Sequence, residues 1–257
     1  MGSSLLGGLK NIRHLGAFSL ITLTTLVMKS DLAYRVIRPL IQWQILRAGL
    51  RVLPIMCFLG AALGVVIVGQ TVQLLLQVGQ AKLVGPLLVN IIVRELAPLT
   101  SALVVLARVG TATVAELGTA RAMGEVEALE ALGIDPINYL VVPRLVGIAT
   151  AVVCLSGYMI LFALGFGYLY SFLRGLPLSP GEFFGLVASA LDWADFPLLA
   201  LKTSAFGVVT GLIICYQGLA QPVRLEEVGE ATTRTVAQTV VACLLIDAVF
   251  IPVYLIL

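Results

Sequence analysis

Residues 143–172 read PRLVGIATAVVCLSGYMILFALGFGYLYSF, and beyond Arg144 this stretch carries no charged side chain. A helix crosses a bilayer with about 20 apolar residues at a rise of about 1.5 Å each, so the run is long enough to span. Four other stretches qualify, at about 50–78, 84–107, 196–219 and 234–257. The sequence therefore predicts an all-α, polytopic membrane protein with five transmembrane helices.

The composition of the 257 residues supports this prediction. Hydrophobic residues make up 60% and charged residues 12%, whereas soluble domains average about 45–50% and about 25%. So few charges could not cover the surface of a water-soluble fold. The four cysteines fall inside apolar runs without C-x-x-C spacing, so we expect neither a disulfide framework nor a bound metal. The net charge of +2 gives no sign of a nucleic-acid partner.

Two amphipathic segments, at about 9–28 and 32–48, precede the first span. The second mixes arginines with large apolar residues, which is typical of a helix that lies in the membrane interface. A further span over 15–28 is the alternative, but Lys29 and Asp31 cut that run short. We therefore predict two regions, an N-terminal interfacial arm at 1–49 and a five-span domain at 50–257.

Basic residues predict the orientation of the spans, because cytoplasmic flanks carry more lysine and arginine. Seven basic residues precede or open the first span, and the loops after spans two and four hold most of the others. The opposite side has only Lys82 and Arg174. We expect a cytoplasmic N-terminus, an external C-terminus and an external segment at 173–195 with a helix over 180–191.

A polar segment from Arg108 to Pro136 follows the second span and is expected to be cytoplasmic. Thr113-x-x-Glu116 fits a capping box that opens a helix, and Gly133 fits a helix stop. The resulting helix either lies against the protein's own spans or docks into a cytoplasmic partner as a coupling helix. Periodicity alone does not separate the two interpretations.

Arg94 and Glu95 lie inside the second span, about 15 Å from its start and hence near the bilayer midplane. Charges at that depth are costly and usually face a cavity or a partner. Pro98 has no amide hydrogen, so the carbonyl of Arg94 loses its helical bond. We expect these charges to line a cavity, with a purely structural ion pair as the alternative.

Lys202 in the fourth span and Asp247 in the fifth have similar predicted depths, closer to the outer end. Isolated charges in lipid are costly, so we expect these two residues to form a structural ion pair. On this interpretation they are too far out to serve as partners for Arg94 and Glu95.

The sequence lacks the motifs of several enzyme classes. It contains no G-x-x-x-x-G-K-[ST] phosphate loop, and its single histidine, His14, precedes the first span. We therefore expect no ATP hydrolysis by this chain, no histidine-based catalysis and no bound cofactor.

Several spaced motifs together resemble the MlaE-type permeases of bacterial ABC transporters for phospholipids. They are Arg94-Glu-Leu-Ala-Pro98, Ala107-Arg-Val-Gly-Thr-Ala112, Ala115-Glu-Leu-Gly-Thr-Ala-Arg121, Asp135-Pro136, Pro143-Arg144 and Gly229-Glu-Ala-Thr-Thr-Arg-Thr235 followed by Asp247. The likeness runs from about Gly60 to the C-terminus. Ala97 departs mildly from the pattern, since many members carry glycine there.

The resemblance implies a homodimeric permease in the bacterial inner membrane with a periplasmic C-terminus. It further implies a cytoplasmic ABC ATPase subunit that holds ATP and magnesium, an external MCE-domain protein and, in some systems, a STAS-domain subunit. Phospholipid would occupy a central cavity lined by spans one, two and five, on its way between the inner and outer membranes.

The same resemblance assigns roles to individual residues. Arg94 and Glu95 would meet the lipid headgroup, and Leu74, Leu75 and Val78 the acyl chains. The ATPase-coupling residues would be Glu116, Arg121 and Glu125. Two other functions stay open, namely an ion-coupled secondary carrier that uses Glu95 or Asp247, and a membrane tether for an MCE-domain protein that transports nothing.

Overall fold

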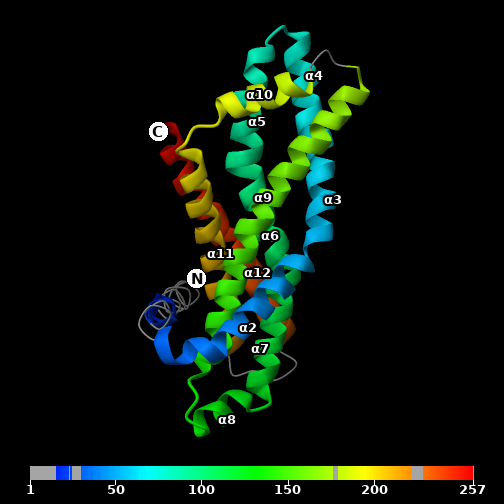
Figure 1. The fold of residues 1–257 in the computed structure, drawn as a ribbon. Coiled ribbons are helices and arrows are strands. Elements are labelled where there is room, and N and C mark those ends of the chain that lie inside the picture. The colour runs from blue at the N-terminus through cyan, green and yellow to red at the C-terminus, as the bar shows by residue number, and fades with distance from the viewer. Residues whose placement is uncertain (1–15, 23, 25–29, 176–178, 221–227, 257) are drawn as a thin grey trace, which may run out of the picture. The chain divides into compact units, whose positions relative to one another are not determined.

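The computed structural model describes residues 16–22, 24, 30–175, 179–220 and 228–256, and this part of the chain is helical without strands (Figure 1). Residues 16–22 and 24 are helical. The longer helices are α2 (Ser30–Leu50), α3 (Leu53–Leu63), α4 (Gly69–Gln77), α5 (Val84–Leu88), α6 (Ala97–Val105), α7 (Thr111–Ala122), α8 (Glu125–Ala131), α9 (Val142–Leu173), α10 (Pro180–Ala190), α11 (Asp195–Ala220) and α12 (Val228–Ile256). Lys10, Arg13, Lys29 and Arg224, which contributed to the predicted orientation, lie outside the described residues.

Short segments with wider or tighter turns join several of these helices. The π-helical segments are η1 (Gly64–Val68), η3 (Val89–Leu96), η4 (Leu106–Gly110) and η5 (Ile137–Val141), and η2 (Ala81–Leu83) is a 3-10 turn. Because a π-helical turn holds one residue more than an α-helical turn, it changes which side chains share a face.

Five helical runs are long and apolar enough to cross a membrane, as the sequence predicts. They are Arg38–Gln77, Ala81–Ala122, Ile137–Leu173, Asp195–Leu219 and Gly229–Tyr254. The first two runs are longer than predicted. The first includes part of α2, and the second continues past residue 107 through η4 and α7.

The predicted capping box at Thr113 is wrong. Thr113 lies inside continuous helix, and its hydroxyl donates a hydrogen bond to the carbonyl of Val109 at 2.7 Å. The side chain of Glu116 turns to Arg47 instead of capping the backbone. The helix therefore continues from η4 directly into α7, with no new start at Thr113.

Two glycines set the limits of α8, the separate short helix after the second run (Figure 1). Gly124 before it and Gly133 after it have φ of 77° and 73°, a backbone region that glycine occupies at little cost. The amide of Gly133 donates to the carbonyl of Glu130, and that of Ile134 donates to Leu129, which closes the C-terminus. The predicted stop at Gly133 is confirmed, whereas the predicted start moves to Glu125.

The chain divides into two compact units. Unit 1 comprises residues up to Ala48 together with Leu106–Ala149 and Val208–Ala242, and unit 2 comprises Gly49–Val105, Thr150–Gly207 and Cys243–Leu257. In unit 1, Leu117, Val126, Val141, Cys215 and Leu219 form a buried cluster that joins α7, α8, η5 and α11.

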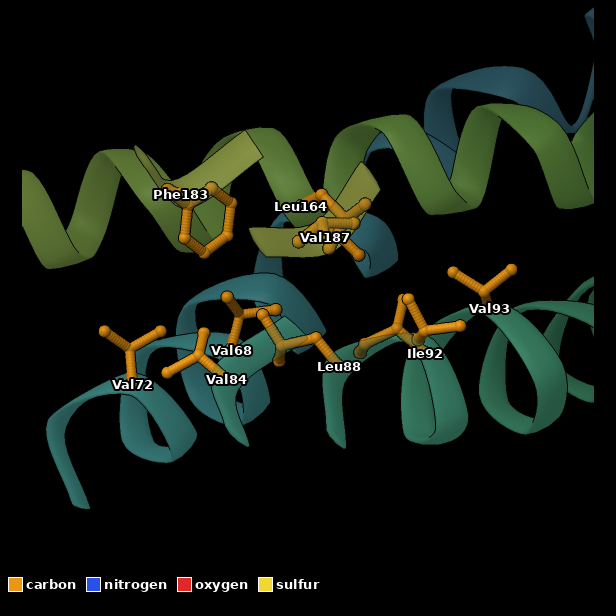
Figure 2. Close-up of a cluster of buried hydrophobic side chains, with 11 residues drawn as sticks. Val68, Val72, Val84, Leu88, Ile92, Val93, Leu164, Phe183 and Val187 are labelled. Atoms are coloured by element: carbon orange, nitrogen blue, oxygen red, sulfur yellow. The ribbon is translucent and has the colours of Figure 1, made fainter. Parts of the chain in front are cut away.

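Unit 2 has a larger apolar core (Figure 2). Phe183 and Val187 of α10 and Leu164 of α9 face a row of aliphatic side chains. The row consists of Val68, Val72, Val84, Leu88, Ile92 and Val93. The core therefore ends one residue before Arg94, and it fixes the helical segment that carries the charges.

Glycines allow close backbone contact within unit 2. A Cβ atom on Gly85 would lie 2.0 Å from the carbonyl oxygen of Leu186 in α10, and one on Gly64 would lie 2.2 Å from that of Ala163 in α9. Small residues permit this approach between helices in membranes. The predicted helix at 180–191 is confirmed as α10, and Gly85 lets it rest directly on α5.

Candidate functional site

The second span is irregular where it carries its charges. In η3, hydrogen bonds run over five residues, and the amide of Ala97 donates to the carbonyl of Ile92. Pro98 follows, and without an amide hydrogen it cannot donate to the carbonyl of Arg94. Such wide turns occur often at functional sites because they redirect side chains. Arg94 and Glu95 are thus presented by a non-standard stretch of helix.

Arg94 forms an ion pair with Asp195, the first residue of α11. Its Nε lies 2.8 Å from Oδ1 and its Nη2 3.1 Å from Oδ2 of that carboxylate. Oδ2 also accepts a hydrogen bond from the amide of Asp192 at 3.0 Å. The side chain of Asp195 is 5% exposed, so the pair is largely shielded from solvent. The carboxylate of Asp195 therefore connects Arg94 with the loop between α10 and α11.

Lys202 is the centre of the charge cluster and is fully buried. Its Nζ lies 2.7 Å from the carbonyl oxygen of Arg94, 3.0 Å from Oε2 of Glu95 and 2.8 Å from Oδ1 of Asp247. An ammonium group has three N–H donors, and here each has an acceptor. A buried charge is tolerated when it is paired and hydrogen-bonded in this way.

Tyr254, near the end of α12, packs against both cations. Its ring centroid lies 5.1 Å from Cζ of Arg94 and 5.5 Å from Nζ of Lys202, within the range of cation–π attraction. The hydroxyl of Tyr254 is buried, and no described residue hydrogen-bonds to it. Within the described part of the chain, its ring thus has partners and its hydroxyl has none.

A pocket of about 480 Å³ opens beside this cluster in unit 2. It is lined by Asn90, Ile91, Arg94, Glu95, Leu96, Ile251 and Tyr254. Most of its wall is apolar, and it also includes the adjacent charged residues Arg94 and Glu95, with the ring of Tyr254 packed on Arg94. Such a pocket suits an amphipathic ligand.

The structure brings Arg94, Glu95, Lys202 and Asp247 into one cluster. This corrects the expectation that Lys202 and Asp247 lie too far toward the outer end to serve as partners of the other two. The expected depths assume regular helices, with residues placed by their distance from the outer end of each apolar run. The second run begins earlier and contains η3, so that count does not give the level of Arg94.

Two residues of this site were missed from the sequence. Asp195 was placed in an external loop, yet it begins α11 and binds Arg94. Tyr254 lies within the predicted fifth span, and the sequence analysis assigns it no role. A carboxylate one residue before a predicted span, and a tyrosine two residues after the proline at 252, were the available signals.

The three apolar residues predicted to meet acyl chains are not in this pocket. Leu74 and Val78 are exposed, at 61% and 74%, and Leu75 packs against the core of unit 2. None of them is among the residues that line the pocket beside Arg94.

The residues predicted for coupling lie in unit 1. Glu116 binds Arg47 of α2 and lies 3.8 Å from Arg144 of α9, and Arg121 donates to the carbonyl of Leu219 in α11. Glu125 begins α8 and is exposed. Two of the three therefore have partners within the chain, and the third faces outward.

The fold and this cluster define a multi-pass α-helical membrane protein with a paired charge cluster inside its spans. The permease MlaE family matches residues 41–252, and the chain belongs to this family. It is a membrane transporter permease, the non-catalytic membrane subunit of a transporter.

Individual relatives agree with this assignment. A probable ABC transporter permease protein of Synechocystis is 32% identical over 70% of this chain and 68% of its own length. A probable ABC transporter permease protein of Rickettsia prowazekii is 27% identical over 92% of this chain and 90% of its own length. The chloroplastic protein TRIGALACTOSYLDIACYLGLYCEROL 1 of Arabidopsis thaliana is 26% identical over 87% of this chain and 65% of its own.

Proposed function

We propose that this chain is the permease subunit of an ATP-driven ABC transporter that moves phospholipids between the inner and outer membranes of a bacterium. The observation that carries the proposal is the pocket beside Arg94, whose wall is mostly apolar and also includes the charged residues Arg94 and Glu95. A phospholipid has the same division between acyl chains and headgroup. The relatives named as ABC transporter permeases support the transporter class, and the Arabidopsis relative, named after a galactolipid, supports a lipid as the cargo.

Arg94 is the residue that would meet the lipid phosphate. Asp195 engages its Nε and Nη2, and the remaining Nη1, which has no acceptor among the described residues, would donate to the phosphate. Glu95 is held by Lys202 and lines the same pocket, so it limits the space for the headgroup. Leu74 and Val78 offer exposed apolar surface that suits acyl chains farther from the pocket.

A homodimer is part of the proposal. In an apolar stretch of 18 residues within the α12 span, 11% of the residues are buried within the chain, against 33–56% in the corresponding stretches of the other four spans. A second copy that covers this helix would enclose the pocket to which α12 contributes Ile251 and Tyr254. The other partners we propose are a cytoplasmic ABC ATPase that holds ATP and magnesium, an MCE-domain protein outside and, in some systems, a STAS-domain subunit.

Coupling to the ATPase is proposed to run through α7 and α8. Glu125 and Glu127 in the first turn of α8 present exposed carboxylates to a cytoplasmic partner. Glu116 and Arg121 hold α7 against α2, α9 and α11, so that a movement of α8 reaches those helices. We propose an N-terminus in the cytoplasm, in line with the basic residues before the first span.

Photo-crosslinking in reconstituted membranes tests this function. A p-benzoylphenylalanine at Ile91, which lines the pocket, should capture phospholipid in an amount that changes when the ATPase is trapped with vanadate. The same group at Phe58, which is 73% exposed, should capture lipid independently of the ATPase state. If capture at Ile91 is also independent of it, the pocket is not on the transport route. Transport by the chain without ATPase would favour a secondary carrier, and no transport with all partners present would favour a tether.

A further inference from the structure

The charge cluster beside the pocket carries one negative charge in excess when all of its groups are ionised. Arg94 pairs with Asp195. Lys202 pairs with Glu95 and Asp247. The cluster therefore joins two cations with three carboxylates, so one carboxylate charge is not compensated within it. An uncompensated charge away from water is costly, and a cation bound beside it lowers that cost.

Glu95 is the carboxylate of the three that reaches the pocket. It lines the pocket of about 480 Å³, whereas Asp195 and Asp247 are not among the lining residues. The side chain of Glu95 is 31% exposed, against 15% for Asp247 and 5% for Asp195. Lys202 contacts Oε2 of Glu95 and has no exposed surface. A ligand in the pocket therefore meets the carboxylate and not the ammonium of Lys202.

An amide lies on the same wall of the pocket. Asn90 also lines the pocket, is exposed, and makes no side-chain hydrogen bond to a described residue. It precedes Glu95 by five positions, the spacing of the hydrogen bonds in η3, which places the two residues on one side of that segment. Polar residues within a span are costly and often mark the path of a substrate. The amide oxygen of Asn90 and the carboxylate of Glu95 thus offer two acceptors to N–H donors.

We propose that this pocket selects a zwitterionic lipid with a primary ammonium headgroup, phosphatidylethanolamine, and that Glu95 and Asn90 are its specificity-determining residues. The ammonium donates to the Glu95 carboxylate and the Asn90 amide oxygen, while the phosphate meets Arg94. A choline headgroup has the same charge but no N–H donor. A glycerol headgroup leaves the lipid with a net negative charge, which adds to the excess of the cluster. The inference rests on the proposed function, because it places a phospholipid in the pocket beside Arg94.

Binding of four short-chain lipids that differ only in the headgroup tests the proposal. They are the dihexanoyl forms of phosphatidylethanolamine, its N,N-dimethyl derivative, phosphatidylcholine and phosphatidylglycerol, titrated calorimetrically into the purified full-length protein in maltoside detergent. The wild type should bind phosphatidylethanolamine about tenfold more tightly than phosphatidylcholine, as expected for lost hydrogen bonds to a charged acceptor. The dimethyl derivative should lie between them because it keeps one N–H donor, and phosphatidylglycerol should bind most weakly.

Two variants assign the preference to the pocket. Glu95→Gln removes the excess charge and keeps the size of the side chain, so phosphatidylglycerol should no longer bind more weakly than phosphatidylcholine. Asn90→Ala changes an exposed residue without a described partner, so it should fold normally and reduce the preference for phosphatidylethanolamine over phosphatidylcholine. Glu182→Gln is the matched control and should keep the wild-type order, because Glu182 is an exposed carboxylate of unit 2 outside the pocket.

The outcomes that overturn the inference differ from those that overturn the proposed function. Equal affinity of the wild type for phosphatidylethanolamine and phosphatidylcholine overturns the inference, as does tightest binding of phosphatidylglycerol, and in both cases the lipid site stands. If Glu95→Gln and Asn90→Ala both keep the wild-type order, these residues do not select the headgroup. If Glu95→Gln does not fold, the wild-type order and Asn90→Ala decide the question without it. If the wild type binds none of the four lipids, both the inference and the lipid site in the proposed function fail.

Discussion

The Nζ atom of Lys202 donates to the carbonyl oxygen of Arg94 over 2.7 Å, and this carbonyl is the one that Pro98 leaves without its α-helical donor. A proline in the second span thus creates an acceptor that a lysine from the fourth span fills. The same ammonium also binds Glu95 and Asp247, so one buried side chain connects three helical segments of unit 2. A backbone irregularity and a buried charge therefore stabilise each other.

Removal of Lys202 should be strongly destabilising. Lys202→Met leaves Glu95, Asp247 and the Arg94 carbonyl without their shared donor, which we expect to cost about 3–5 kcal/mol. Lys82→Met, at an exposed lysine, is the control and should change little. The measurement is thermal or chemical unfolding of the purified protein.

Partial rescue should follow from removal of the stranded acceptors. Lys202→Met with Asp247→Leu should recover part of the loss, and a further Glu95→Gln should recover more, because fewer unpaired carboxylates then remain. If the losses simply add in the double-mutant cycle, the contacts of Lys202 with these carboxylates do not contribute to stability.

Asp195 should stabilise the folded protein through its ion pair with Arg94. Asp195→Asn removes the charge that neutralises the guanidinium, and we expect a loss of about 1–3 kcal/mol because Arg94 is partly exposed. Asp192→Asn is the matched control, since the described contact of Asp192 uses its backbone amide. Equal melting temperatures for the two variants would contradict a stabilising ion pair.

Two features of the fold could be predicted from the sequence, namely the five spans and the free backbone carbonyl of Arg94. Five runs of apolar residues predict five spans because a bilayer core demands that length. The free carbonyl of Arg94 follows from the covalent structure of Pro98 alone. The partners of Arg94 could not be predicted in the same way. Asp195 lies in a polar stretch that resembles a loop, and only the packed structure shows that it starts α11 opposite Arg94.

At the end of the second span, polar residues gave a wrong prediction of where a helix begins. The sequence from Arg108 to Arg121 has the composition of a surface segment, yet it is helical throughout. Two of its charged residues have partners within unit 1, Glu116 in Arg47 and Arg121 in the carbonyl of Leu219. Those partners are distant in sequence, so local composition cannot reveal them.

The contact between α5 and α10 should depend on Gly85. Gly85→Ala puts a methyl group against the carbonyl of Leu186, which must shift, and we expect a loss of about 1–3 kcal/mol in unfolding free energy. Gly185→Ala in α10 meets no atom within 4 Å and should stabilise the helix by about 0.5–1 kcal/mol. Stabilisation in both variants would show that helix propensity, and not the close approach, decides the effect.

The N-terminus of α10 should weaken in acid. Ser179 and Glu182 form a capping box, in which the Glu182 carboxylate accepts from the amide and hydroxyl of Ser179 at 2.9 Å each. These hydrogen bonds, the backbone one first, lower the pKa of Glu182 below its ordinary value of 4.5. A carboxyl whose pKa is lower in the folded state stabilises it above the ordinary pKa and loses this effect as the pH falls through the lowered value.

Hydrogen exchange at the start of α10, corrected for the intrinsic pH dependence, measures this effect. Protection should fall below about pH 4.5 in the wild type. Glu182→Gln cannot titrate, so its protection should be independent of pH over the same range. An identical acid response in both proteins would assign the change to another group.

Substitutions at Glu116 and Glu125 should have different effects, the first on the stability of the chain and the second on binding of the ATPase. Glu116→Gln breaks the contacts with Arg47 and Arg144 and should lower stability by about 1 kcal/mol, a modest value because the carboxylate is partly exposed. Glu125→Lys reverses an exposed charge in the first turn of α8 and should cost less than about 1 kcal/mol through the helix dipole. If α8 docks into an ATPase through its carboxylates, Glu125→Lys should nevertheless reduce co-purification of that subunit several-fold. Glu116→Gln should retain the ATPase at temperatures where the protein stays folded.

Full co-purification and transport with Glu125→Lys would mean that α8 only packs against its own chain.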